Sequence, residues 1–269
     1  MADARMSLPA PRRFGETTRR DAWWFQSAVT FLGLGAFVVY STWAAFQNGH
    51  YEFGPYLSPF YSPLLFGPSP HAWFGGPAVP AWWPGALPYS AALLILWAPG
   101  GFRFTCYYYR GAYYKAFWAD PPACAVGEPR KKYLGERWFP LVFQNIHRYF
   151  LYLALGFLVV LSDDVWTAMW FPAAGGGTEF GIGIGTVVLA TNVVLLGGYT
   201  LGCHSMRHLA GGVLDVVSGR PIRRTAYVCS SALNRAHMRW AWASLFSVGF
   251  SDVYVRLCSM GVWTDHRLL

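Results

Sequence analysis

The sequence has few charged residues, and long stretches have none. Only 13% of its 269 residues are Asp, Glu, Lys or Arg, whereas 54% are apolar. A water-soluble domain has roughly twice that charged fraction. No charged residue occurs from Phe53 to Phe102 or from Phe180 to Met206. Uncharged stretches of more than about 20 residues can cross the hydrocarbon core of a bilayer as helices. The composition therefore excludes an ordinary soluble domain and indicates one membrane domain.

Other absences narrow the class of protein further. The five cysteines have no paired spacing, which argues against a disulfide framework. The arginine-rich start is interrupted by prolines and followed by an apolar run long enough to span, so no cleavable signal is expected. Basic cytoplasmic loops account for the net charge of +8, and no nucleic-acid partner is expected.

The remaining pattern predicts an all-α integral membrane protein with five transmembrane helices. A basic tail at residues 1–22 precedes a membrane domain at residues 23–269. The helices are expected at about residues 23–46, 84–118, 140–163, 181–208 and 236–262. Prolines are too dense between Gln47 and Trp83 for a regular helix, so this segment is expected to be an outer loop. The Pro99-Gly100-Gly101 group is expected to kink the second helix.

Lysine and arginine positions predict the orientation of the chain. The N-terminus, the loop between the second and third helices and the loop at residues 207–235 carry nearly all of them. The two loops on the opposite side carry none. The positive-inside rule therefore predicts a multi-pass protein of the cytoplasmic membrane, with a cytoplasmic N-terminus and an external C-terminus.

Histidines and cysteines gather at the cytoplasmic ends of these predicted helices. Counting about 1.5 Å per helical residue places seven of them in one layer. They are Cys106, Cys124, His147, Cys203, His204, His208 and His237. Each alone is most simply an interfacial polar residue. Because ionisable side chains within membrane spans are uncommon and tend to mark functional pathways, the set together favours a metal or redox centre.

The residue types leave three kinds of centre open. Histidines on facing helices suit a b-type haem with two axial imidazoles. Two cysteines and two histidines suit a Rieske-type [2Fe–2S] centre. Zinc accepts the same ligands but explains less of the surrounding chemistry. No histidine lies deep in the outer half of the helices, which argues against a second haem. Composition alone favours haem.

Five segments together resemble a known family. They are Phe102–Arg110, Pro122–Val126, Gln144–Phe150, Thr200–His208 and Asn234–Met238. They are similar to the single-chain, five-helix membrane anchor of the succinate dehydrogenase (respiratory complex II) of mycobacteria and other actinobacteria. The similarity extends over about residues 23–268 and is strongest on the inner side. Met206 departs from the pattern, because relatives often carry a second cysteine there.

The resemblance implies a membrane-embedded Rieske-type [2Fe–2S] cluster in place of haem b. By position it implies thiolate ligands from Cys106 and Cys124 and imidazole ligands from His204 and His237. The residues held in reserve as ligands are His147, Cys203 and His208. It also implies a flavoprotein subunit, an iron–sulfur subunit, membrane lipid and quinone as partners, and it allows a trimer of complexes.

Under this reading the chain transfers electrons to quinone but does not oxidise succinate itself, because it has no dinucleotide-binding glycine motif and no soluble domain. Quinone reduction consumes two protons, so donors must lie near the headgroup. The candidates are His147, Arg148, Tyr149 and Tyr107, with Trp138 and Arg110 nearby. A haem-containing cytochrome b anchor is the alternative within the redox class.

A small membrane transporter is the alternative from another class. It requires polar residues or broken helices near the midplane, where the fourth helix offers only Thr191 and Asn192. Asp252 in the fifth helix is a costly residue in a membrane span. It lies one turn before Arg256, which predicts an intrahelical ion pair, with a proton route or outer polar cavity as the alternative.

Overall fold

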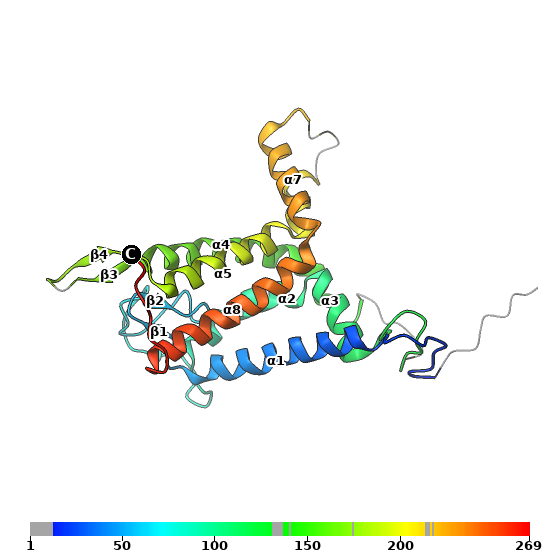
Figure 1. The fold of residues 1–269 in the computed structure, drawn as a ribbon, viewed down its shortest axis with the longest axis horizontal. Coiled ribbons are helices and arrows are strands. Elements are labelled where there is room, and N and C mark those ends of the chain that lie inside the picture. The colour runs from blue at the N-terminus through cyan, green and yellow to red at the C-terminus, as the bar shows by residue number, and fades with distance from the viewer. Residues whose placement is uncertain (1–12, 131–136, 140, 174, 213–215, 217) are drawn as a thin grey trace, which may run out of the picture. The chain divides into compact units, whose positions relative to one another are not determined.

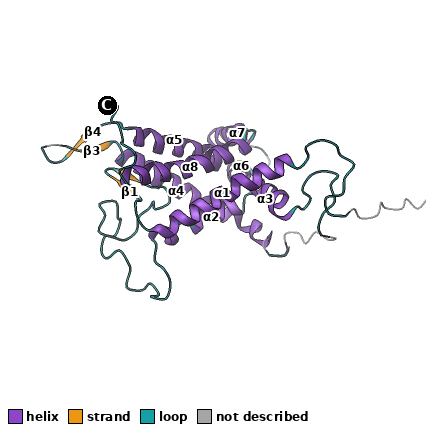
Figure 2. Ribbon diagram, turned by 60° about the horizontal axis from the view of Figure 1, so that its bottom comes forward, coloured by secondary structure: helices purple, strands orange, loops and turns teal. Residues whose placement is uncertain are grey.

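The computed structural model describes residues 13–130, 137–139, 141–173, 175–212, 216 and 218–269, and these are mostly helical (Figure 2). The α-helices are α1 (Phe25–Gln47), α2 (Trp97–Phe104), α3 (Tyr107–Tyr113), α4 (His147–Thr167), α5 (Ile184–Leu201), α6 (His204–Gly211), α7 (Pro221–Asn234) and α8 (His237–Ser259). The shorter helical turns are η1 (Ala91–Leu94), η2 (Tyr114–Trp118) and η4 (Leu141–Ile146). Two antiparallel hairpins pair β1 (Glu52–Phe53) with β2 (Tyr56–Leu57) and β3 (Trp170–Pro172) with β4 (Thr178–Phe180).

The chain divides into two compact units. The first comprises Met1–Ala36 and Thr105–Asn145, and the second comprises Phe37–Phe104 and Ile146–Leu269. In the second unit α5 packs against both α4 and α8, and α2 packs against α4 (Figure 1). The first unit contains the start of α1, together with α3 and η2.

Within the described part of the chain, three helices are long and apolar enough to cross a membrane. They are Phe25–Gln47, Leu141–Thr167 and Ile184–Leu201. Helix α8 has 23 residues, enough to span a bilayer, but Arg239, Asp252 and Arg256 lower its mean hydropathy. The three spans overlap the predicted helices at 23–46, 140–163 and 181–208, and a five-helix count stays a prediction.

The segment expected to form one helix at 84–118 is divided into η1, α2, α3 and η2. The helical run is interrupted at Thr105-Cys106, not at Pro99, which the sequence pattern favoured. Pro99 is the third residue of α2. In the first turn of a helix, backbone N–H groups have no intrahelical acceptor, so proline is tolerated there without a kink.

Two segments expected to be loops contain regular structure. The loop at 207–235 is largely α6 and α7, and α7 projects from the end of the α4, α5 and α8 bundle (Figure 1). Arg207 ties these helices together, because its guanidinium donates to Ser231 Oγ and to Tyr227 OH, both at 3.1 Å. The second segment is the loop after α4, one of the two loops without lysine or arginine, and it forms the β3–β4 hairpin.

Helices α5 and α8 approach each other closely at a glycine. A Cβ atom built on Gly198 would lie 2.5 Å from a ring carbon of Trp240. The neighbouring Gly197 has no atom within 4 Å of the same position. Close approach of helix backbones through small residues is a common way to pack membrane helices. Gly198 thus fixes the position of Trp240, and with it the start of α8.

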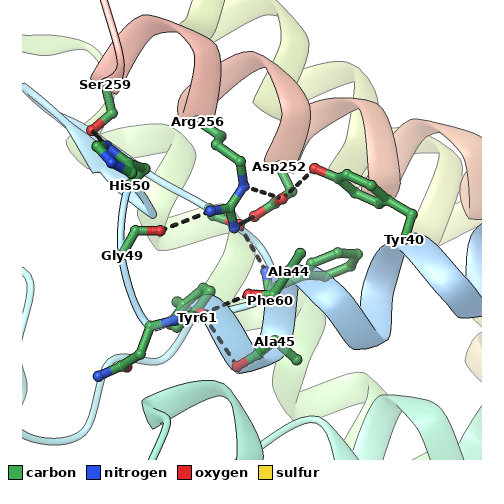
Figure 3. Close-up of polar contacts among 12 residues, drawn as sticks. Tyr40, Ala44, Ala45, Gly49, His50, Phe60, Tyr61, Asp252, Arg256 and Ser259 are labelled. Atoms are coloured by element: carbon green, nitrogen blue, oxygen red, sulfur yellow. Dashed lines mark hydrogen bonds and ion pairs between the residues drawn. The ribbon is translucent and has the colours of Figure 1, made fainter.

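A buried polar cluster holds the loop that follows α1 to α1 and α8 (Figure 3). The Asp252 side chain is fully buried and pairs with Arg256, with Arg256 Nε 3.2 Å from Asp252 Oδ2. The predicted intrahelical ion pair is therefore confirmed. Asp252 also accepts hydrogen bonds from Tyr40 OH, at 2.6 Å, and from Ser58 Oγ. Arg256 donates to the carbonyl of Gly49 at 2.8 Å. Each charge is thus compensated inside the fold.

We expect Gly198→Ala to destabilise the protein by about 1–3 kcal/mol, because the new methyl group overlaps the Trp240 ring. Gly197→Ala is the matched control and should leave the thermal unfolding midpoint at or above that of the parent chain. Unfolding of both variants in detergent, followed by tryptophan fluorescence, checks this. Equal midpoints for the two variants would contradict the close packing of α5 on α8.

Asp252→Asn should destabilise the protein by about 3–5 kcal/mol, because it leaves the Arg256 guanidinium buried without its counter-charge. Removing both charges in Asp252→Asn, Arg256→Gln should restore part of the loss. Thermal unfolding of the parent, both single variants and the double variant measures the coupling. Strictly additive losses would show that the pair contributes nothing as a pair.

Candidate functional site

A buried imidazole and a buried thiol meet at one end of the second unit. His147 is the first residue of α4, and Cys203 directly precedes α6. Their side chains are almost fully buried, and His147 Nε2 lies 3.1 Å from Cys203 Sγ. Both are among the reserve ligands expected from the sequence, and the fold brings them into contact. Imidazole nitrogen and thiolate sulfur are ligands for zinc and for iron–sulfur clusters.

Aromatic rings connect His147 to His237. Phe102 of α2 stacks on the His147 ring, with centroids 4.8 Å apart and planes 7° apart. Tyr199 of α5 meets Phe102 edge-on at 5.4 Å. His237, the first residue of α8, stacks on Tyr199 at 5.1 Å and 16°. This ring stack, His147–Phe102–Tyr199–His237, joins four helices through one buried layer.

Sequence reasoning did not select Phe102 or Tyr199. Phe102 begins one of the segments that carry the family resemblance, but its residue type does not mark it as a site residue. Tyr199 offered one usable signal, because it lies four residues before Cys203 and so projects from a similar side of the chain. The ring contacts of Phe102 and Tyr199 join residues that are far apart in sequence, and such contacts cannot be predicted from local residue spacing.

Arg103 brings a positive charge to the ring stack. Its guanidinium carbon lies 4.7 Å from the centroid of the Tyr199 ring, which is a cation–π distance. The same group donates to the carbonyl of Ala241 at 3.3 Å and to Ser244 Oγ at 3.0 Å. Acceptors on α8 therefore hold Arg103 against the face of the Tyr199 ring.

His204 and His208 form a separate pair on α6. Their Nε2 atoms are 3.0 Å apart, as expected for side chains one turn apart on the same helix face. His204 lies beyond the apolar span that ends at Leu201. Partial burial, followed by the nearby His208 and Arg207, lowers the pKa of His204. A lowered pKa favours the neutral imidazole, which is the form that binds metals.

The two cysteines expected as thiolate ligands, Cys106 and Cys124, both lie in the first unit. Cys106 is buried and directly precedes α3. Cys124 is exposed in the loop after η2. The carbonyl of Cys124 accepts from Arg19 Nη1 at 3.0 Å, and the carbonyl of Ala125 accepts from Thr17 Oγ1 at 3.0 Å. Hydrogen bonds from Thr17 and Arg19, which precede α1, thus hold the loop that carries Cys124 in place.

The predicted ligands therefore form smaller groups within each unit. In the second unit His147 contacts Cys203, His204 contacts His208, and His237 joins through Tyr199. Among the described residues no group of three or more histidine, cysteine or acidic side chains is arranged to hold a metal ion. Of the quinone candidates, Arg148, Tyr149 and Tyr107 are exposed and only His147 is buried.

A mainly apolar cavity of about 190 Å³ lies beside the ring stack in the second unit. Phe102, Arg103 and Tyr199 form one wall, and apolar side chains of α1, α4, α5 and α8 form much of the rest. Thr200 and Ser41 supply hydroxyl groups. The cavity offers an apolar ligand a site next to the half-buried Arg103 guanidinium and the Tyr199 phenol ring.

Comparison with known proteins assigns the family. The sequence model of the actinobacterial succinate dehydrogenase subunit SdhC matches residues 25–261. A chain in the structure titled "Mycobacterium smegmatis Sdh1 complex in the apo form" is 42% identical, with a TM-score of 0.83. The match covers 97% of this chain and 98% of that chain. A search of curated proteins finds no match. The chain belongs to the family of the actinobacterial succinate dehydrogenase membrane subunit SdhC.

Proposed function

We propose that this chain is the electron-transfer anchor of a succinate:quinone oxidoreductase and passes electrons from an iron–sulfur subunit to a membrane quinone. The succinate chemistry belongs to partner subunits of the complex. We further propose that a Rieske-type [2Fe–2S] cluster carries the electrons. Its expected ligands are Cys106, Cys124, His204 and His237, with His147, Cys203 and His208 as the alternatives. Family membership is the observation that carries this proposal.

The donor types in the chain fit such a cluster. A Rieske centre needs two thiolates on one iron and two imidazoles on the other. The contact between His147 Nε2 and Cys203 Sγ supports the fit, because an imidazole and a thiol from different helices already share one buried space. When bound, the cluster would supply one-electron transfer at a potential raised by its histidine ligands.

Protein side chains near this layer have separate tasks. The rings of Phe102 and Tyr199 fill the space between His147 and His237. Arg103, held by Ala241 and Ser244, places a positive charge on the Tyr199 face and so favours a reduced centre nearby. The apolar cavity beside Phe102 and Tyr199 suits the ring or tail of a quinone.

The ring stack disfavours the haem alternative for one pair of histidines. His147 and His237 would need to face a porphyrin from opposite sides to serve as axial ligands. The rings of Phe102 and Tyr199 occupy the path between them. A macrocycle there would have to displace both rings and the contacts of Arg103.

A transporter has little support in the described residues. Asn192 is buried in the middle of α5, and its Oδ1 atom has no hydrogen-bond partner within the part of the chain that the structure describes. One such amide does not form a substrate path. The helix break at Thr105-Cys106 contains Cys106, a predicted ligand of the cluster, so we relate this break to electron transfer and not to transport.

We expect His204→Ala and His237→Ala to lower succinate:quinone reductase activity of the purified complex by on the order of 100-fold or more, because each removes an imidazole ligand. Succinate oxidation with an artificial acceptor for the soluble subunits should be unchanged. Iron per complex should fall in parallel with quinone activity. His50→Ala, in the outer loop, is the control. If both variants kept full quinone reductase activity, His204 and His237 would not be the imidazole ligands.

Arg103→Gln should lower the reduction potential of the membrane centre while leaving its spectrum nearly unchanged, because a nearby cation stabilises the reduced form. Arg239→Gln removes the same charge from an exposed position of α8 and is the matched control. A redox titration of each purified complex measures the effect. An equal shift in both variants, or none in either, would show that the Tyr199-facing charge has no special role.

A further inference from the structure

A second cavity, in the first unit, differs in chemistry from the one beside the ring stack. It has a volume of about 400 Å³ and lies between the start of α1, helix α3 and the loop that carries Cys124. Its cations are Arg19 and Lys115, and its neutral polar groups include Gln26 and Thr30. No acidic side chain of the described residues lines it. The lining therefore suits an anion.

The balance of charge around the cavity suits a ligand that carries one negative charge. Arg19 is paired with Asp21 and also donates to the Cys124 carbonyl, so its charge is compensated. Lys115 forms no ion pair or side-chain hydrogen bond with any residue that the structure describes. One uncompensated positive charge remains, and a phosphodiester carries a single negative charge.

The cavity walls are held in place without a ligand. Ser27 Oγ donates to the Pro122 carbonyl at 2.7 Å, which fixes the loop to the first turn of α1. The Phe31 and Phe117 rings contact each other with centroids 4.8 Å apart, which fixes η2 to α1. The loop, η2 and α1 thus keep the polar groups around an open space, so little ordering would be needed on binding.

The location suits a lipid headgroup. Helix α1 begins at Phe25 and is one of the apolar helices long enough to cross a membrane. The cavity lies around this end and includes Trp23 and Tyr107, side-chain types enriched at membrane–water interfaces. Trp24, Phe25 and Val29 are exposed next to it. Acyl chains could therefore continue along this apolar face of α1.

We propose that this cavity binds the phosphate-bearing headgroup of an anionic phospholipid in the leaflet at which α1 begins. Lys115 provides the charge, and Gln26 and Thr30 provide hydrogen bonds. A neutral quinone would not use the ammonium group in this way, and inorganic phosphate would gain nothing from the exposed apolar face of α1. The inference stands apart from the proposed electron transfer, although Cys124 and Tyr107 line part of the wall.

Two variants test the site without touching those two residues. Lys115→Gln removes the charge. Gly111→Leu fills the cavity, and a Cβ atom on Gly111 meets no atom within 4 Å, so the helix should tolerate the change. Arg20→Gln removes an exposed charge next to Arg19 and is the matched control. Lys115→Arg should keep the binding.

The intact complex is purified in mild detergent, and retained lipid is counted by native mass spectrometry. We expect one phosphatidylglycerol-class lipid per copy of this chain in the parent complex. Retention should fall about fivefold in Lys115→Gln and be lost in Gly111→Leu. Arg20→Gln and Lys115→Arg should match the parent. Equal retention in all variants would overturn the proposal.

Adding material back to delipidated complex distinguishes the sources of the anion. Phosphatidylglycerol vesicles should raise the thermal midpoint of the parent complex but not that of Gly111→Leu, whereas phosphatidylcholine vesicles should not. Protection of the parent by inorganic phosphate alone would identify a free-anion site and overturn the lipid assignment. A raised KM for quinone in Lys115→Gln with unchanged lipid retention would instead make this a quinone pocket.

Discussion

The packing of α5 on α8 determines where the ring stack lies. Gly198 lets the Trp240 ring approach the backbone of α5, with ring carbons 2.5 Å from where a Cβ atom would be. Tyr199 follows Gly198 directly, and His237 precedes Trp240 by three residues, so the same contact sets both partners of the Tyr199–His237 stack. Phe102 and His147 then complete the layer from α2 and α4. A change in the spacing of α5 and α8 would disturb all four rings together.

The two ends of the second unit are filled by different kinds of side chain. At the end with the histidines, aromatic rings, imidazoles and a thiol fill the interior, and acceptors on α8 hold the Arg103 guanidinium. At the opposite end, Asp252 and Arg256 form a buried ion pair, and their hydrogen bonds reach α1 and the loop that follows it. Such a pair contributes little net stability, since desolvation offsets attraction. Its effect is to fix the loop, because Ser58 and the Gly49 carbonyl of the loop bind the two charges directly.

Sequence patterns predicted the features that local composition controls. The apolar helices, the Asp252–Arg256 pair and the family followed from charge gaps, i,i+4 spacing and short motifs. The break at Thr105-Cys106 and helix α7 did not. Proline in a first turn looks the same in sequence as proline in a helix interior, and an amphipathic helix rich in arginine, such as α7, looks like a basic loop. Phe102 and Tyr199 were missed because ring contacts between distant residues leave no periodic signal. The ligand set itself stays a prediction.

We propose that this anchor carries an iron–sulfur cluster instead of haem. The most direct measurement is low-temperature EPR of the purified, reduced complex, recorded together with its optical spectrum. We expect a signal whose average g value falls in the Rieske range and which is absent from the isolated soluble subunits. A sharp haem α-band in the optical spectrum without that signal would contradict it.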